Sequence, residues 1–199
     1  PRTDYDWSEY VSRFSQPVVS HEIGQWCVYP NFKEISKYDG VMRPANMEIF
    51  RDILQNNGMI HLADSFLLAS GKLQALCYKA DVEAALRTRN FGGFQLLGLN
   101  DFPGQGTALV GVLDAFWEGK GYISPEEYRR FCAPTVPLAR LPKLIYKNDE
   151  LLNARVEVAH YGETPLKNVA AGWTLSDTAG NVLQSGQWKV DLLPIGNNF

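Results

Sequence analysis

Cysteine and histidine are scarce in this sequence, which has three of each among 199 residues. The cysteines, Cys27, Cys77 and Cys132, are too widely separated for a compact disulfide framework or for the paired ligands of a zinc site. We expect three free, buried thiols, with one bridge and one free thiol as the alternative. No two histidines lie at helical spacing, and we expect neither a metal nor a cofactor.

Positive charge is not in excess, since 19 Lys and Arg stand against 22 Asp and Glu, for a formal net charge of −3. Nucleic-acid binding depends on clustered Lys and Arg, so no nucleic-acid partner is expected. The longest apolar runs, Phe94–Leu99 and Ala108–Leu113, are interrupted by glycine and fall well short of the about 20 residues of a membrane-spanning helix. No membrane segment is expected, and Pro1–Trp7 lacks the charged and then apolar pattern of a signal peptide.

Two apolar segments read as strands of a parallel sheet. Pro17–His21 is rich in β-branched residues, and Gly93–Asp101 is continuously apolar, which is typical of a strand covered on both faces. Between them the pattern predicts one helix from about Asn46 and a longer second helix with a single apolar stripe. The residues of that stripe are Leu62, Phe66, Ala69, Leu73, Leu76 and Ala80. Parallel strands joined by helical crossovers favour an α/β fold, the C-terminal portion of a (β/α)8 TIM barrel.

The end of this first region is marked by a capping box over Ser124–Glu127, which predicts a helix start. After Pro134 the sequence changes to short β-rich segments separated by turns. The expected strands cover Lys143–Lys147, Leu151–Tyr161, Asn168–Leu175 and Val182–Val190, with a hairpin turn at Asp177–Asn181. Such a pattern predicts an immunoglobulin-like β-sandwich, which is only partial because a complete one needs roughly 100 residues. We place the domain boundary near Pro137, with residues 1–136 as barrel and 137–199 as the start of the sandwich.

The candidate functional residues lie at the ends of the two predicted strands, where a parallel barrel places its chemistry. A carboxylate can attack the anomeric carbon of a sugar or stabilise the positive charge of its transition state, and aromatic rings can stack on the sugar. Glu22 is therefore a candidate for the catalytic residue. The predicted sugar-binding residues are His21, Trp26, Tyr29, Asn100 and Asp101. Other interpretations stay open: Glu22 as a surface residue, His21 as a structural residue, Trp26 and Tyr29 as core, and Asp101 as either a structural residue or an acid/base.

Three motifs resemble glycoside hydrolase family 2. Ser20–Phe32 is similar to the strand-seven segment of β-mannosidases and related β-galactosidases, where Ser-Glu-Tyr-Gly precedes an aromatic-rich stretch and Pro. Gly93–Asp101 resembles strand eight, which usually reads Tyr-Trp-Gln-Leu-Asn-Asp, and Glu127–Pro134 resembles the family's Tyr-x-Arg-Arg-Phe-x-Ala-Pro. The three motifs in order, together with the β-rich segment that follows them, span most of the chain. The sequence departs from the family at Leu97 and Gly98, which replace the strand-eight Trp and Gln and leave the sugar specificity open.

The resemblance implies a fragment of a retaining glycoside hydrolase that cleaves β-glycosidic bonds in oligo- or polysaccharides, with Glu22 as nucleophile. The family's acid/base is a Glu that follows Asn at the end of strand four. No Asn-Glu pair occurs in this chain, so the acid/base is expected outside it and the fragment alone is expected to be inactive. The resemblance also implies a periplasmic or secreted bacterial location.

The expected partners are a carbohydrate substrate and the remainder of the parent polypeptide, and a homo-oligomer stays open. Two alternatives come from other functional classes. The first is a carbohydrate-binding scaffold that has lost the chemistry. The second is an interaction module that assembles through its β-rich segment.

Overall fold

The computed structural model describes residues 1–199, which divide into two compact units. One unit is Tyr5–Cys132, and the other combines Pro1–Asp4 with Ala133–Phe199. Pro137, where the sequence analysis places the domain boundary, lies inside a strand of the second unit.

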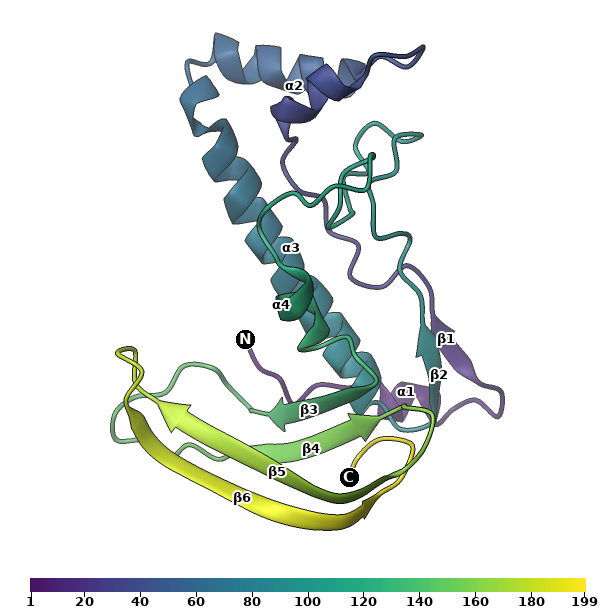
Figure 1. The fold of residues 1–199 in the computed structure, drawn as a ribbon, viewed down its shortest axis with the longest axis vertical. Helices are drawn as coiled ribbons and strands as arrows, with labels where there is room; N and C mark the ends of the chain where they lie inside the picture. Colours follow the sequence, from purple (N-terminus) through teal and green to yellow (C-terminus); the bar gives the residue numbers. More distant parts are fainter. The chain divides into compact units, whose positions relative to one another are not determined.

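The unit Tyr5–Cys132 holds most of the helices and a two-stranded parallel sheet. Its elements in chain order are α1 (Ser8–Val11), β1 (Val18–Ser20), η1 (Phe32–Lys37), α2 (Ala45–Asn56), η2 (Ile60–Leu62), α3 (Ala63–Arg87), β2 (Phe91–Phe94) and α4 (Pro125–Arg129). Strands β1 and β2 lie side by side and point in the same direction (Figure 1), with Val18 opposite Phe91 and Ser20 opposite Phe94. A buried apolar cluster fills the space between α2, α3 and the loops. Its members are Val28, Met47, Leu67, Leu109 and Tyr122.

The predicted barrel portion is wrong. The strands form three separate two-stranded sheets, and β1 and β2 pair only with each other. β2 ends at Phe94, so most of the segment predicted as a doubly covered strand lies outside it, and Leu97 and Leu99 are 38% and 44% exposed. A barrel requires each strand to be hydrogen-bonded on both sides until the sheet closes on itself. The apolar character of this segment indicated burial, but it did not show whether other strands would pair with it.

The helix boundaries are closer to the prediction than the sheet. α2 begins at Ala45, next to the predicted start, and buries Met47 and Leu54. The capping box before α4 is confirmed: the Ser124 side chain accepts from the backbone N–H of Glu127, and the Glu127 side chain accepts from the N–H of Ser124. Both features depend on contacts within a few residues of the chain, which the sequence specifies locally.

The long helix α3 buries a different face from the predicted one. Leu73 and Leu76, in the middle of the predicted stripe, are 57% and 62% exposed. The covered face in the middle of the helix consists of Leu67, Gly71, Gln74, Tyr78 and Val82. Gly71 belongs there because a Cβ at this position would lie 2.2 Å from an atom of the Tyr122 ring, which packs directly on the helix backbone.

The unit that contains Ala133–Phe199 is formed by two antiparallel strand pairs. β3 (Thr135–Arg140) pairs with β4 (Arg155–His160), and β5 (Leu166–Ser176) forms a long hairpin with β6 (Val182–Leu193). The hairpin turn is confirmed at Asp177, whose Oδ1 accepts from the N–H groups of Ala179 at 2.9 Å and Asn181 at 2.8 Å.

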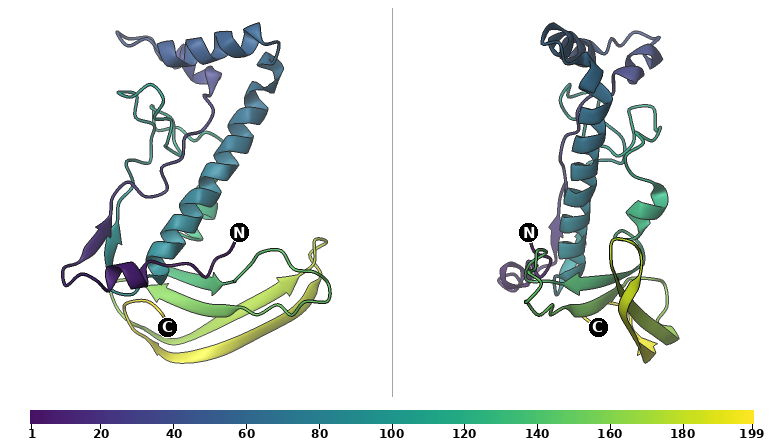
Figure 2. Two further views of the ribbon diagram at one scale, coloured as in Figure 1. Left: turned by 180° about the vertical axis from the view of Figure 1, so that it is seen from behind. Right: turned by 90° about the vertical axis from the view of Figure 1, so that its left-hand side faces the viewer.

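The predicted immunoglobulin-like sandwich is also wrong. The two pairs remain separate two-stranded sheets, and Figure 2 shows the long curved β5–β6 hairpin. Trp173 and Trp188, predicted as sandwich core, are each 38% exposed. A sandwich core forms only where the inner faces of two sheets interdigitate. Val136 and Leu138 of β3 are buried, but the β5–β6 hairpin leaves most of its apolar side chains uncovered.

The cysteines are free, as predicted, but they are not all buried. Cys27 is exposed, and Cys77 and Cys132 are partly buried. Burial raises the pKa of the Cys132 thiol, as expected for a thiol in apolar surroundings.

Candidate functional site

The chain bulges at the carboxyl end of β1. The Ser20 carbonyl accepts from the N–H of Gln95 at 3.0 Å, and the Gln95 carbonyl accepts from the N–H of Ile23 at 2.9 Å. In a regular parallel ladder, the carbonyl and the N–H that bind one residue of the neighbouring strand belong to residues two positions apart. The groups that bind Gln95 belong to Ser20 and Ile23, which are three positions apart. One extra residue is therefore accommodated between Ser20 and Ile23, and His21 and Glu22 occupy the bulge.

Glu22 carries the backbone strain of this bulge. Its φ is +55°, in the left-handed region that non-glycine residues occupy at a cost on the order of 1 kcal/mol. Its side chain is 37% exposed, and the closest ionisable group to its carboxylate is the imidazole of the 74% exposed His21, whose Nδ1 lies 3.7 Å away. No hydrogen bond holds the Glu22 carboxylate, so its oxygens are available to a ligand.

The loop after Glu22 is fixed to α3 by three polar side chains. Asp81 Oδ2 accepts from the N–H of Gly24 at 3.2 Å, and Gln74 Nε2 donates to the Trp26 carbonyl at 2.6 Å. Further along, the Ser70 hydroxyl accepts from the N–H of Tyr29 at 2.8 Å. Polar residues at steps of four and seven along one helix face the same side, so α3 satisfies successive backbone groups of an irregular loop.

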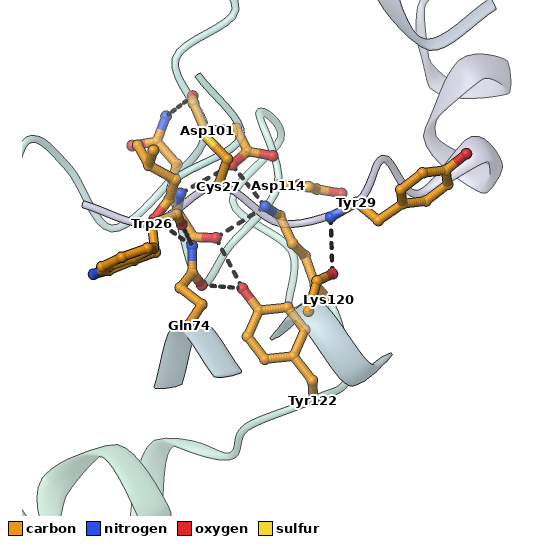
Figure 3. A network of polar contacts seen from close by, with 12 residues as sticks. Trp26, Cys27, Tyr29, Gln74, Asp101, Asp114, Lys120 and Tyr122 are labelled. Atoms are coloured by element: carbon orange, nitrogen blue, oxygen red, sulfur yellow. Dashed lines mark hydrogen bonds and ion pairs between the residues drawn. The ribbon is translucent and has the colours of Figure 1, made fainter. Parts of the chain in front are cut away.

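The two aromatic residues of this loop have different surroundings. The Trp26 side chain is 56% exposed, whereas the Tyr29 ring packs in an aromatic cluster. Figure 3 shows their rings pointing to opposite sides of the polar network around Gln74. Burial raises the pKa of Tyr29. Trp26 is therefore an exposed indole close in sequence to Glu22, while the Tyr29 ring is partly buried among other aromatic rings. The rings that contact Tyr29 are Phe32, Phe50 and Phe66.

Asp101 and Asn100 lie in a buried network. Asp101 is 2% exposed, and its Oδ1 accepts from Lys120 Nζ at 2.6 Å and from the N–H of Gly111 at 2.9 Å. Burial raises the pKa of Asp101, and Lys120 opposes that shift. The Asn100 amide donates to the Asp101 carbonyl at 3.1 Å. The Asp101 carboxylate therefore joins the segments of Gly111 and Lys120 and is already occupied, whereas the Asn100 side chain bonds only to the adjacent residue.

The network continues through the buried side chains of Gln74 and Tyr122. The Tyr122 hydroxyl donates to Gln74 Oε1, and Gln74 Nε2 donates to the Val110 carbonyl at 2.8 Å (Figure 3). The sequence analysis missed both residues. In the sequence, Gln74 is a polar residue beside an apolar helix stripe. Exposed helix positions show the same pattern, so the pattern does not predict its burial.

Glu34 is a second buried carboxylate of this region. It is 1% exposed, and its Oε2 has no hydrogen-bond partner. Burial first, and then the negative charge of Asp101, raise the pKa of Glu34 to about 7, with Lys120 acting in the opposite direction. The carboxyl group is therefore poised to titrate near neutral pH.

Comparison with protein families gives a match that lies outside this site. Residues 150–199 are similar to a family described as a domain of unknown function, DUF8488. No curated protein matches the chain. The matched segment covers β4, β5 and β6, so it carries no information on Glu22 or its neighbours.

Further features limit the chemistry of the described residues. No group of three or more His, Cys, Asp or Glu side chains is arranged to hold a metal ion. None of the helices combines the length and the apolar character needed to cross a membrane. The arrangement around β1 is thus one accessible carboxylate on a fixed backbone with an exposed indole nearby in sequence. Such a group can act as a nucleophile or as a hydrogen-bond acceptor.

Proposed function

We propose that this chain is part of a retaining glycoside hydrolase in which Glu22 is the nucleophile. The observation that carries the proposal is the bulge after β1, because it holds Glu22 in a strained backbone conformation and leaves its carboxylate without a hydrogen bond. Strained non-glycine residues cluster at functional sites, where their surroundings maintain them. The ordered resemblance of three segments to glycoside hydrolase family 2 supports the same residue.

In the proposed reaction a Glu22 carboxylate oxygen forms a bond to the anomeric carbon while the bond to the leaving glycosidic oxygen breaks. The leaving oxygen takes a proton from a separate acid, and water then releases the sugar from Glu22 with the same group acting as base. The Asp101 carboxylate is occupied by Lys120 and Gly111, which argues against Asp101 as this acid. We therefore assign the acid/base to a residue outside these 199 positions.

The proposal is tested by Glu22→Gln in the full-length protein, assayed on aryl β-galactosides and β-mannosides. Turnover should fall by on the order of 10³-fold or more, because the amide cannot form the covalent intermediate. Glu9→Gln is a matched control, since Glu9 is an exposed glutamate of α1 whose partner is Arg13. Normal turnover by Glu22→Gln would remove Glu22 from the mechanism.

A second candidate is sugar binding without hydrolysis. The occupied carboxylate of Asp101 and the exposed indole of Trp26 favour it, because stacking needs no acid/base. Titration of the full-length protein with β-linked oligosaccharides would show binding that depends on Trp26, in the absence of any release of reducing sugar.

A further inference from the structure

The conformation of Glu22 is maintained by the residues on both sides of it. On the N-terminal side the Ser20 carbonyl is bound by the backbone of Gln95, and on the C-terminal side the Ile23 N–H is bound by the same residue. The next backbone group, the N–H of Gly24, is bound by Asp81 Oδ2 at 3.2 Å. A residue with unfavourable φ persists only when its surroundings over-determine it, and these bonds supply that restraint.

Gly24 also lies directly against α3. Its φ is +68°, and a Cβ built on it would lie 2.4 Å from Cδ1 of the Tyr78 ring. Tyr78 is 2% exposed, and its hydroxyl donates to the Val110 carbonyl at 2.7 Å. Burial and this hydrogen bond fix the position of the ring. Tyr78 and Asp81 are three residues apart on α3 and therefore lie on one face. The Tyr78 ring limits how closely Gly24 can approach α3, and the hydrogen bond to Asp81 holds Gly24 at this position.

Asp81 differs from the other acidic residues of α3 in its partners. Asp64 pairs with Lys33 at 2.9 Å, and Glu83 pairs with Arg87 at 2.6 Å. Asp81 is partly buried, forms no ion pair, and accepts its hydrogen bond from the Gly24 N–H. Burial raises the pKa of Asp81, while the Gly24 hydrogen bond acts in the opposite direction. Burial of a carboxylate without a cation is costly unless the group is hydrogen-bonded, and the Gly24 N–H is the donor that offsets this cost at Asp81.

We propose that Asp81 is a positioning residue for Glu22, and this inference rests on the proposed function. Through the Gly24 N–H, Asp81 fixes the backbone two residues after Glu22 and thereby sets the direction in which the Glu22 carboxylate projects. We therefore expect Asp81 to affect the alignment of Glu22 with the anomeric carbon and not the binding of the sugar. Misplacement of a reacting group by about 1 Å can cost about 100-fold in rate.

The experiment compares Asp81→Ala and Asp81→Asn in the full-length protein with p-nitrophenyl β-D-galactoside and β-D-mannoside. Asp81→Ala should lower kcat by about 10- to 100-fold with little change in KM, because only the alignment of the nucleophile is lost. Asp81→Asn should stay within about 3-fold of the wild type, because its amide oxygen still accepts from Gly24. Asp64→Ala is the control on the same helix and should leave both constants unchanged.

A second readout reports on Glu22 itself. With a 2,4-dinitrophenyl 2-deoxy-2-fluoro-β-glycoside, a Glu22 oxygen bonds to the anomeric carbon as the bond to dinitrophenolate breaks, and dinitrophenolate leaves with the electron pair. Peptide mass spectrometry then gives the site and the rate of labelling. We expect labelling of Glu22 that is about 10-fold or more slower in Asp81→Ala than in the wild type. Equal melting temperatures of the wild type and Asp81→Asn would show that the conservative variant folds.

The outcomes separate the two proposals. Absence of label on Glu22 in the wild type would overturn the proposed function, and the role of Asp81 with it. Labelling of Glu22 at the same rate in the wild type and in Asp81→Ala would overturn only the role of Asp81. A loss in Asp81→Asn equal to that in Asp81→Ala, or a rise in KM at constant kcat, would also contradict positioning through the Gly24 hydrogen bond.

Discussion

Glu22 and Asp101 both lie at the ends of segments that the sequence predicts as strands, but their surroundings differ. Glu22 is partly exposed, strained in its backbone and free of hydrogen bonds to its carboxylate. Asp101 is 2% exposed and is bound by Lys120 and by the N–H of Gly111. The comparison shows that a carboxylate after an apolar segment has no fixed role. Its partners decide whether it stabilises the fold or remains available for chemistry.

The largest expected effect is the loss of stability on substitution of the buried Asp101. Asp101→Asn removes the hydrogen-bonded counter-charge of the buried Lys120 ammonium, and the free energy of unfolding should fall by about 3–5 kcal/mol. Urea unfolding of the wild type and the variant measures this difference. The control is the double variant Asp101→Asn with Lys120→Met, which removes both charges and should recover much of the loss. A loss below about 1 kcal/mol in the single variant would show that the pair is not truly enclosed.

Glu34, beside the same cluster, should make stability depend on pH. Its pKa is about 7 in the folded protein, above the value of 4.5 for an unperturbed Glu, so the folded state retains a proton that the unfolded state has released. Its contribution is fully present below about pH 4.5 and is lost as pH rises toward 7, with a slope of at most about 1.4 kcal/mol per pH unit. Urea unfolding between pH 5 and pH 8 should show this decline.

The Glu34→Gln variant isolates this contribution, because Asp101 and Asp81, whose pKa values are also raised, titrate in both proteins. The difference in stability between the wild type and Glu34→Gln should change across this pH range. A constant difference would contradict the assignment of the proton to Glu34.

A smaller effect is expected at Glu22, where glycine should be more stabilising than alanine. Glycine adopts φ of +55° without steric cost, so Glu22→Gly should be more stable than Glu22→Ala by on the order of 1 kcal/mol. Thermal unfolding of the two variants measures the difference. The same pair of substitutions at Glu9, inside α1, should give the opposite order, since glycine is the poorer helix former. Equal stability at position 22 would mean that the backbone is not strained there.

The smallest effect should follow Glu22→Gln. This variant keeps the size of the side chain and removes a charge whose nearest ionisable group is an exposed His at 3.7 Å, so stability should change by less than about 0.5 kcal/mol. Set beside the loss of activity expected for the same variant, an unchanged melting temperature would separate function from folding. A large loss of stability would place Glu22 with Asp101 as a structural carboxylate.

The features that could be predicted from the sequence depend on contacts between near neighbours. The start of α2, the capping box at Ser124 and the turn at Asp177 all follow from such contacts. The covered face of α3 could not be predicted, because buried Gln74 binds groups that are distant in the chain. These are the Trp26 and Val110 carbonyls and the Tyr122 hydroxyl. Strand β3 was not predicted, because the domain boundary was placed near its Pro137. That strand pairs only with β4, and an edge strand tolerates a residue without an N–H.

The site was predictable only as a set of residue types. An apolar segment followed by His21 and Glu22 indicates a strand end, but it does not reveal the bulge or the hydrogen bond from Gly24 to Asp81. Those features join residues that are distant in the chain. For the same reason Asp101 could be recognised as a candidate but not as the partner of Lys120.

The extra residue in the bulge also has a consequence for evolution. Neighbouring side chains in an extended segment face opposite ways, so inserting or deleting one residue exchanges which of two neighbours faces a given side. Loss of a single codon between Ser20 and Ile23 would restore the regular ladder against Gln95 and leave one residue where the bulge now holds His21 and Glu22. One in-frame deletion, without any change to the helices, could therefore abolish the presentation of this acid and turn the loop into an ordinary strand end.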